Sequence, residues 1–335
     1  MKTPINIEIP SCLPQHPWHP SVVYVSEGWN GHRFWMAQTP YPPFHVAPYK
    51  DRWELPCIHY SDDGMHWNTI DANPIDDLTD EQMANHSYHS DPHLVMKDGV
   101  LYCYYRLMEN NDAKTTILRK KSVDGIHWSD REMITFDNGK STLDNCKLEI
   151  ISPAVVWTGE KWRMYYVDDT FTNLQRGIQL AESEDGILFE VVGSVWKQQE
   201  VKPWHIDVQL IDGIYYLLIH DVDNNSLWLY TSQDGIQFGE GKEVLRVSGR
   251  LTDFWSHKLY RACLVCVDGK IHIYFSANDG MASYLGQIQQ VENGSLYIVD
   301  CLNGKEKCRF VLRFWCRRCK QLVQRLMHFI EKRIK

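Results

Sequence analysis

The sequence predicts an all-β fold, a five-bladed β-propeller followed by a basic amphipathic helix, and three observations support this prediction. Aromatic residues make up 12% of the 335 residues, and Trp and Tyr favour strands. A short Ser-x-Asp-Gly phrase recurs four times along the chain. A pattern of two strands precedes each phrase, and it aligns with itself five times.

The spacing of the phrase sets the length of the repeat. Its serines, Ser61, Ser122, Ser183 and Ser232, are 61, 61 and 49 residues apart. Before each phrase, two apolar or aromatic runs flank a tight turn, which is typical of a β-hairpin. The run SDPHLVMKDGVLYCYYR (90–106) aligns without gaps on 151–167, 204–220 and 260–276, and 19–37 fits with two extra turn residues. Each repeat is therefore expected to form one four-stranded antiparallel blade.

The repeats define the expected domains. Residues 1–300 form the propeller and 301–335 the helical tail, and the blades lie at approximately 15–70, 86–135, 148–196, 203–245 and 257–300. The fifth blade lacks the phrase, and its outer strand is expected from 295–300 or from 5–9. An open sandwich of hairpins is the alternative, but it explains neither the period nor the five copies. The phrase itself is predicted to be a structural turn, because Asp accepts backbone N–H bonds and Gly allows a positive φ.

Charge and composition limit the function classes. The net charge is −8, but residues 305–335 contain eleven Lys or Arg and two Glu, a net of +9 that leaves −17 for the body. No apolar run approaches the roughly 20 residues that cross a bilayer. Prolines occupy the N-terminal region where a signal peptide would be apolar, so we expect a cytoplasmic chain with reduced cysteines. The CRRC stretch (316–319) has no partner motif that would complete a zinc site.

Polar residues open the first strand of every predicted blade. The alignment places five residues in this position, where each side chain should face the propeller axis: His19, Asp91, Ser152, His205 and Arg261. Gathering such groups is costly unless something polar binds there. The alternative is a water-filled channel lined by polar groups that satisfy one another.

Aromatic and charged residues are expected around this position. The second strands end near the same face with Arg106, Asp168 and His220, and the first strands are preceded or begun by Trp18, Tyr88, Trp204 and Tyr260. Sugars stack on aromatic faces while their hydroxyls take hydrogen bonds from charged groups. The sequence therefore predicts a carbohydrate site.

The x-Pro openings HPSVV, SDPHL and ISPAV, together with ISPAVVWTGEKWRMYY, resemble the glycoside hydrolase family 43 and family 32 superfamily over roughly residues 15–300. These proteins are furanosidase-type five-bladed propellers. The resemblance implies that Asp91 is the Asp-Pro carboxylate that orients substrate or tunes a pKa, and that Glu149 is the general acid. The first-blade Asp of the family is replaced by His19.

This departure leaves several arrangements open. Hydrolysis would pair Asp91 with Glu149 or with Asp207, and His19 would act as a base. It could equally mark a site that binds or transfers sugar. Arg261, Arg106 and His205 are expected to bind substrate. Related propellers sometimes hold a calcium ion on the axis, to which His205 and Asp91 could contribute; no other cofactor is expected.

The tail breaks the strand pattern. Its apolar residues recur at helical spacing between cations: Phe310, Val311, Phe314, Trp315, Leu322, Leu326 and Phe329. This pattern is typical of a helix that binds an anionic membrane surface. The alternatives are a helix docked on the acidic body and a nucleic-acid-binding segment. The acidic body lacks basic stripes, so no nucleic acid partner is expected.

Together these features predict a carbohydrate-active enzyme with glycosidase or glycosyl-transfer chemistry on a furanose-like or acidic glycan. It would be peripheral to the inner membrane face and take part in surface-polysaccharide assembly. The alternative is a non-catalytic glycan-binding propeller that recruits a partner.

Overall fold

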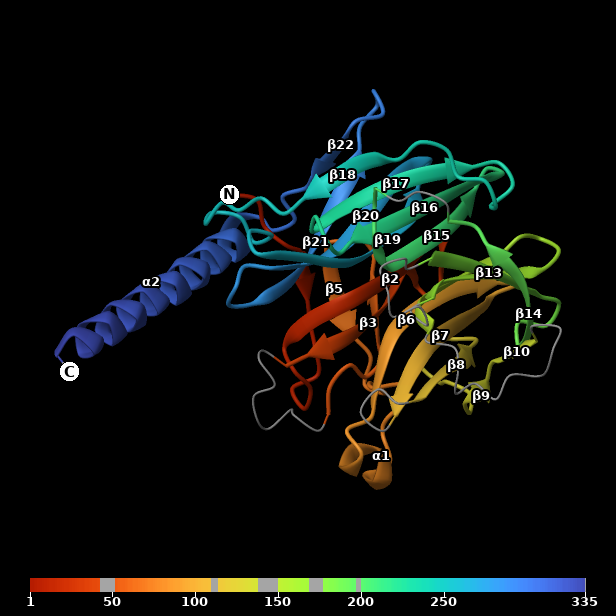
Figure 1. The fold of residues 1–335 in the computed structure, drawn as a ribbon, viewed down its shortest axis with the longest axis horizontal. Helices are drawn as coiled ribbons and strands as arrows, with labels where there is room; N and C mark the ends of the chain where they lie inside the picture. Colours follow the sequence, from red (N-terminus) through yellow and green to blue (C-terminus); the bar gives the residue numbers. More distant parts are fainter. Residues whose placement is uncertain (43–51, 110–113, 138–149, 169–176, 197–199, 335) are drawn as a thin grey trace.

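A computed structural model describes residues 1–42, 52–109, 114–137, 150–168, 177–196 and 200–334. Five sheets surround a common axis, and a long helix leaves the ring beside the N-terminus (Figure 1). The predicted five-bladed propeller with a C-terminal helix is confirmed.

The first three blades each have four antiparallel strands, and two of them gain a fifth, parallel strand. The first contains β2 (His16–Trp29), β3 (His32–Tyr41), β4 (Cys57–Ser61), β5 (His66–Thr69) and the added β1 (Asn6–Ile7). The second contains β6 (Tyr88–Lys97), β7 (Val100–Glu109), β8 (Lys114–Ser122) and β9 (Glu132–Met133). The third contains β11 (Ile150–Trp157), β12 (Trp162–Asp168), β13 (Gly177–Ser183), β14 (Leu188–Ser194) and the added β10 (Thr135–Asp137).

The last two blades have four strands each. The fourth contains β15 (Pro203–Ile211), β16 (Ile214–Asp221), β17 (Ser226–Ser232) and β18 (Lys242–Arg246). The fifth contains β19 (Lys258–Val267), β20 (Lys270–Asn278), β21 (Ser283–Gln290) and β22 (Leu296–Ile298). A short helix, α1 (Asp80–Ala84), joins the first two blades.

The N-terminal segment closes the ring between the first and fifth blades. Of the two candidates for the outer strand of the fifth blade, the segment at 295–300 supplies it, as β22. Strand β1 instead pairs with β5 of the first blade. The Ile5 N–H donates to the Leu285 carbonyl of the fifth blade at 2.9 Å, so this segment bridges both blades.

The Ser-x-Asp-Gly turns are structural, and they also connect neighbouring blades. In the second blade, Asp124 accepts the N–H groups of two following residues and Gly125 has φ +78°. A Cβ at Gly125 would lie 2.2 Å from the Trp35 ring of the first blade. The other three turn glycines each face a tyrosine hydroxyl from the second strand of the preceding blade. Glycine is therefore needed for the turn and for blade packing.

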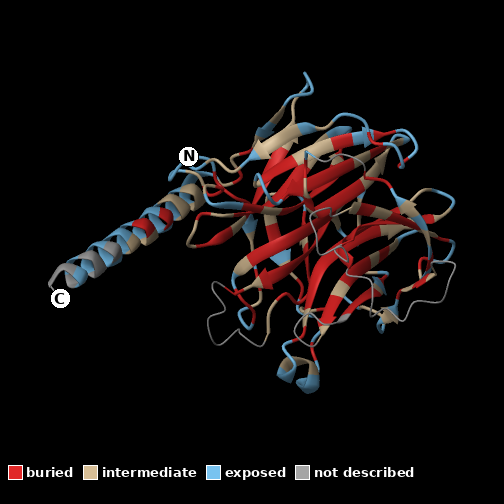
Figure 2. Cartoon of the chain, viewed as in Figure 1, coloured by how far each residue is buried: buried red, intermediate tan, exposed pale blue. Residues whose placement is uncertain are grey.

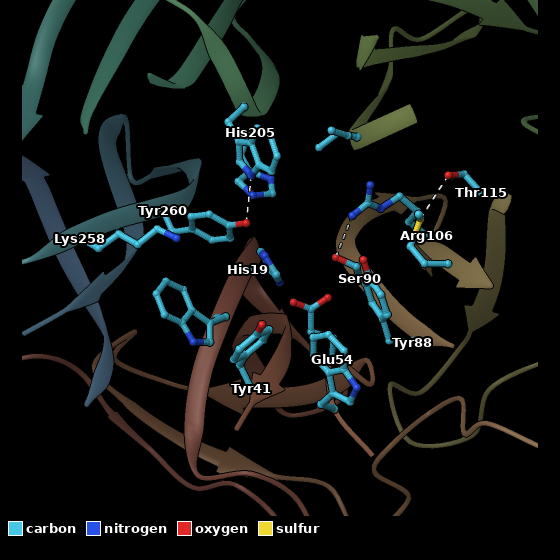
Figure 3. A pocket seen from close by; sticks show the side chains of 15 residues that line it. His19, Tyr41, Glu54, Tyr88, Ser90, Arg106, Thr115, His205, Lys258 and Tyr260 are labelled. Atoms are coloured by element: carbon cyan, nitrogen blue, oxygen red, sulfur yellow. Dashed lines mark hydrogen bonds between the residues drawn. The ribbon is translucent and has the colours of Figure 1, made fainter. Parts of the chain in front are cut away.

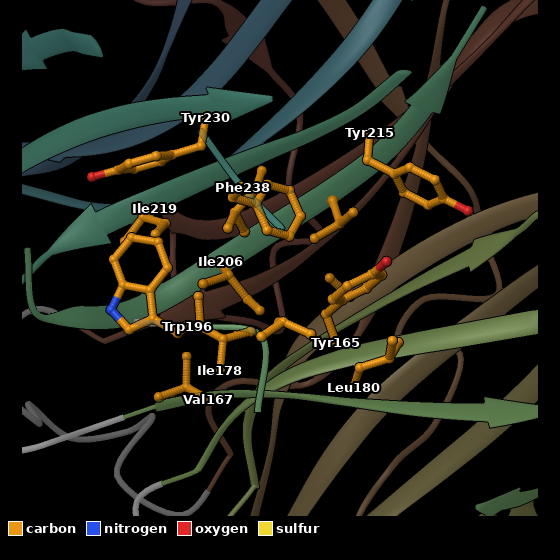
Figure 4. Packing of buried hydrophobic residues seen from close by; sticks show 14 of the residues in the cluster. Tyr165, Val167, Ile178, Leu180, Trp196, Ile206, Tyr215, Ile219, Tyr230 and Phe238 are labelled. Carbon is orange, nitrogen blue, oxygen red and sulfur yellow. The ribbon is translucent and has the colours of Figure 1, made fainter. Parts of the chain in front are cut away.

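The core lies in layers between adjacent blades. Figure 4 shows one such layer, in which Tyr165 and Val167 of β12 pack with Ile206 and Ile219 of the fourth blade. Burial is concentrated in the strands, whereas most of the helix surface is intermediate or exposed (Figure 2).

The tail forms the predicted helix, α2 (Gly304–Ile334). Its first half docks on the fifth blade: Phe314 is fully buried and Phe310 contacts the ring of Tyr284. In the part of the chain that the structure describes, no helix is long and apolar enough to span a bilayer.

Candidate functional site

A cavity of about 580 Å³ opens at the end of the propeller where the first strands begin (Figure 3). Every blade contributes to its wall. The lining residues are Trp18, His19, Tyr41, Trp53, Glu54, Tyr88, Ser90, Arg106, Met108, Thr115, Ile151, Trp204, His205, Lys258 and Tyr260. A volume of this size is within the usual range of small-molecule sites.

The residues predicted to face the axis lie at irregularities of the inner strands. The pairing between the first and second strand shifts register around His19, Asp91, Ser152, His205 and Arg261. His19, Asp91 and Ser152 also have φ of 52–53°. Bulges re-aim side chains, and non-glycine residues with positive φ are strained features that cluster at functional sites.

Asp91 is the centre of a buried charge cluster at the floor of this cavity. Its Oδ1 lies 3.3 Å from His205 Nδ1, 3.7 Å from His19 Nε2 and 3.6 Å from Arg261 Nη1. Its Oδ2 lies 3.3 Å from Arg106 Nε and accepts the Ser152 N–H at 3.1 Å. All five predicted axial residues therefore meet, as the alignment required.

The environment sets the charge states of this cluster. Burial opposes the ionised form of Asp91, but Arg106 and His205 lower its pKa well below the usual range. Burial lowers the pKa of His205 to about 4 and that of His19 well below its usual value, even though Asp91 opposes both shifts. At neutral pH the cluster holds one carboxylate and two neutral imidazoles.

His19, Asp91 and His205 together present atoms that can bind a metal ion. One nitrogen from each of His19 and His205 and one oxygen from Asp91 lie within 4.8 Å of one another. His19 Nδ1 is 2.6 Å from Thr39 Oγ1, and with this nitrogen donating, Nε2 carries the lone pair that faces Asp91. Among the described residues, His19 Nε2, Asp91 Oδ1 and His205 Nδ1 find no hydrogen-bond partner. Orphaned buried polar atoms that converge fit a divalent ion.

Aromatic rings form the walls above this floor. Tyr260 lies against His205 with ring centroids 4.3 Å apart, and its hydroxyl accepts a hydrogen bond from Trp204 Nε1 at 3.0 Å. Trp18 packs edge-on against Tyr260, and Trp53 stacks on Tyr88. The predicted aromatic residues Trp18, Tyr88, Trp204 and Tyr260 all line the cavity.

Glu54 is a functional candidate that the sequence analysis missed. Its side chain lines the cavity and is 6% exposed, and its backbone φ is 53°. Figure 3 shows its carboxylate among the lining residues, together with His19. The alignment covered only the first two strands of each blade, whereas Glu54 precedes the third strand of the first blade. Lys258, which also lines the cavity, was missed as well.

The remaining predicted residues lie elsewhere. Asp207 is buried below the floor, 3.3 Å from His93 Nδ1, and accepts the Leu264 N–H. Asp168 ends β12 and is not among the described residues that line the cavity. His220 lines an adjoining hollow of about 300 Å³ that shares Trp204, Lys258 and Tyr260 with the main cavity. Glu149 lies outside the described residues.

The sequence was compared with known protein families and with individual proteins. No protein-family model matches the chain. Over 312 residues it is 23% identical to an A type blood N-acetyl-α-D-galactosamine deacetylase from Flavonifractor plautii, a match that covers 77% of this chain and 40% of the relative. The chain therefore spans less than half the length of that relative.

Solved structures show the same architecture. An N-acetylgalactosamine deacetylase from F. plautii, in complex with blood group B trisaccharide, superposes with a TM-score of 0.67 at 18% identity, covering 86% of this chain and 94% of that one. A family 43 protein from Bacillus licheniformis gives 0.56 at 16% identity, covering 88% and 57%. A family 32 β-fructofuranosidase from Bombyx mori gives 0.58 at 14% identity, covering 92% and 65%.

The chain has the five-bladed propeller fold of these solved structures. The resemblance to families 43 and 32 is confirmed at the level of fold, since identities this low carry no more than that. What the fold presents in this chain is a sugar-sized aromatic cavity over a buried His-Asp-His cluster.

Proposed function

We propose that this chain is a carbohydrate-active enzyme that removes the acetyl group from an N-acetylated sugar. The single observation that carries the proposal is the cluster of His19, Asp91 and His205, whose facing atoms lack partners among the described residues at the floor of an aromatic cavity. The similarity to a protein named as a sugar deacetylase supports it.

His19, Asp91 and His205 would hold a divalent metal ion. Calcium, expected from the sequence, prefers six to eight oxygen ligands. Two imidazoles and one carboxylate suit zinc or another first-row transition metal instead. When bound, such an ion supplies Lewis acidity toward a carbonyl oxygen and acidifies water.

The chain's own residues would then carry out amide hydrolysis. Glu54 takes a proton from water as the water oxygen bonds to the acetyl carbon, and it returns that proton to nitrogen as the C–N bond breaks. The products are acetate and the free amino sugar. Burial raises the pKa of Tyr260, so its phenol stays protonated and can donate to the acetyl oxygen. The aromatic walls hold the sugar ring.

The glycosidase or glycosyl-transfer chemistry predicted from the sequence has weaker support. Such hydrolysis needs one protonated and one ionised carboxyl group on either side of the glycosidic bond. Two guanidiniums lie beside Asp91, and Asp207 is engaged by His93 below the cavity. We therefore favour deacetylation over that chemistry and over binding alone.

The test is acetate release from oligosaccharides that end in N-acetylgalactosamine or N-acetylglucosamine, with added zinc or manganese. We expect turnover in the wild type, loss of turnover in Glu54→Gln with metal retained, and loss of both in His19→Ala. The surface variant Glu243→Gln serves as a control for the effects of substitution and purification alone. Sugar binding without acetate release under all metal conditions would refute the deacetylase and favour the glycan-binding module. Release of free sugar would instead support a glycosidase.

We also propose that α2 binds an anionic membrane surface at the inner face of the cytoplasmic membrane. Residues 305–335 carry a net charge of +9, and anionic lipid attracts such segments. A role in surface-polysaccharide assembly would follow from this position. Deleting 305–335 should abolish co-sedimentation with vesicles of equal parts phosphatidylcholine and phosphatidylglycerol, and unchanged co-sedimentation would refute the proposal.

A further inference from the structure

Helix α2 docks on the cavity end of the fifth blade. Near its start, Glu306 Oε2 lies 3.0 Å from His66 Nε2, in the turn at the end remote from the cavity. Twelve residues later, Arg318 donates to Ser256 Oγ and to the Asp279 carbonyl. These residues lie at the cavity end of the fifth blade, since Lys258 and Tyr260 follow Ser256 and line the cavity. Phe310 and Arg317 both contact Tyr284, near the start of β21, so the helix lies against this end of the fifth blade over residues 310–318.

The rest of the helix extends away from the fifth blade. Residues 319–334 remain helical, which is roughly 24 Å at 1.5 Å per residue. Figure 1 shows this half running clear of the propeller. The second half of α2 thus leaves the ring sideways from its docking site at the cavity end of the fifth blade.

The helix has two apolar faces. Phe310 and Phe314 face the fifth blade together with Arg317 and Arg318. Seven apolar side chains among the described residues of the helix are 41–66% exposed: Leu312, Trp315, Leu322, Val323, Leu326, Met327 and Ile330. At about 100° per residue, this exposed set forms one stripe on the side opposite the docked residues.

The charge of the helix indicates which kind of partner covers the exposed apolar stripe. A second copy could pair along it, but the net charge of +9 in residues 305–335 would oppose a copy lying alongside. The same charge is complementary to an anionic lipid surface, into which such a stripe inserts.

The smaller hollow leads from the cavity toward this helix. Trp204, Lys258 and Tyr260 are common to both spaces, and His257 lines only the smaller one. Ser256, which precedes His257, contacts Arg318 of α2. An oligosaccharide whose end occupies the main cavity can therefore extend through the hollow toward the lipid-binding helix.

We infer that α2 turns the cavity end of the propeller toward the bilayer, and that the substrate is a glycan attached to lipid in that same membrane. The substrate assignment rests on the proposed deacetylase function, whereas the orientation does not. A substrate held in the membrane gains from the high effective concentration of a co-localised enzyme.

The orientation is tested without activity. Val222, at the cavity end of the fourth blade, and Ile236, in the turn at its other end, are similarly exposed, at 36% and 41%. Each is changed to Cys and labelled with a fluorophore, after the four exposed cysteines and Cys146 are replaced by Ser. Energy transfer to a lipid-borne acceptor in phosphatidylglycerol vesicles should be greater from position 222. Equal or reversed transfer, or dimerisation without vesicle binding, would overturn the inference.

The substrate class is tested by comparing one N-acetylated oligosaccharide free in solution and attached to a lipid in these vesicles. We expect kcat/KM to be higher on the lipid-linked form by about tenfold or more. The variant Leu322→Gln/Leu326→Gln/Ile330→Gln should lose this preference and keep its activity on the free sugar. No preference in the wild type would refute the lipid-linked substrate, while absence of turnover on both forms would refute the deacetylase and leave the orientation result intact.

Discussion

At the scale of single residues, burial first and the neighbouring arginines second explain why the cavity floor holds neutral histidines. Arg106 and Arg261 lie within 3.6 Å of Asp91, and Glu54 contributes a second carboxylate nearby. Further positive charge on His19 or His205 would be opposed by the two guanidiniums and by burial. Neutral imidazoles are the form that binds metal, so both histidines of the proposed metal site are already in the ligating protonation state.

Thr39 is predicted to position His19 for metal binding. Thr39→Val keeps the side-chain shape but removes the partner of His19 Nδ1, so the ring is free to change tautomer. Loss of such an outer contact typically weakens metal affinity about 10–100-fold. Zinc affinity measured by competition with a chelating dye checks this. Thr69→Val, which removes a hydroxyl that Asn73 contacts far from the cavity, should leave affinity unchanged, and equal affinities in all three proteins would contradict the role.

At the scale of elements, the turn glycines connect blade geometry to stability. Gly125→Ala forces a side chain into a positive φ and places its Cβ 2.2 Å from the Trp35 ring. We expect a loss of about 2–4 kcal/mol in the free energy of unfolding, since backbone strain and overpacking add. Gly99→Ala has a similar φ of +73° but no atom within 4 Å, so it should cost only about 1 kcal/mol. Urea unfolding that gives equal losses would contradict the packing role.

The docking of α2 should depend on pH through His66. Hydrogen bonds to Glu306 and then to Asp63 raise the pKa of His66 above its ordinary value of 6.5. The docked state therefore gains stability that is fully present below pH 6.5 and is lost as the pH rises through the raised pKa. Because His66 is partly exposed, we expect the effect to be small.

Limited proteolysis near residue 304, measured against pH, checks this dependence. Cleavage should increase at alkaline pH in the wild type, and His66→Gln should remove the change. His127 makes the same contact with Asp124 in the second blade, but is 86% exposed and lies in a turn remote from α2. His127→Gln should therefore retain the wild-type profile, and a profile unchanged by His66→Gln would contradict the assignment.

At the scale of the whole molecule, the repeat made most of the fold predictable. The blade strands form local hairpins that repeat along the sequence, and aligning these repeats identifies the residues that face the axis. Glu54 could not be found this way because it enters the cavity from an irregular segment between strands. The position of Asp207 was equally hidden, since it follows His205 by two residues on the same face of β15 and so lies deeper along the axis, beside His93. The positions of Glu54 and Asp207 depend on contacts between segments that are distant in the sequence.

The propeller and the tail carry opposite net charges. The propeller carries −17 and the tail +9, and the free half of α2 extends roughly 24 Å. The Debye length is about 30 Å at 0.01 M salt, about 10 Å at 0.1 M and about 3 Å at 1 M. An anionic membrane that holds the helix tip therefore repels the acidic body only at the lowest of these concentrations.

Affinity for phosphatidylglycerol vesicles should consequently be greatest near the intermediate salt concentration. At about 0.01 M the body is repelled, and at about 1 M the attraction of the tail is screened. Co-sedimentation across this range checks the expectation, with the isolated 305–335 peptide as the matched control, because without the body its binding should only decline as salt rises. A steady decline in the full chain as well would contradict the expectation and would mean that the acidic propeller lies beyond the reach of the membrane field.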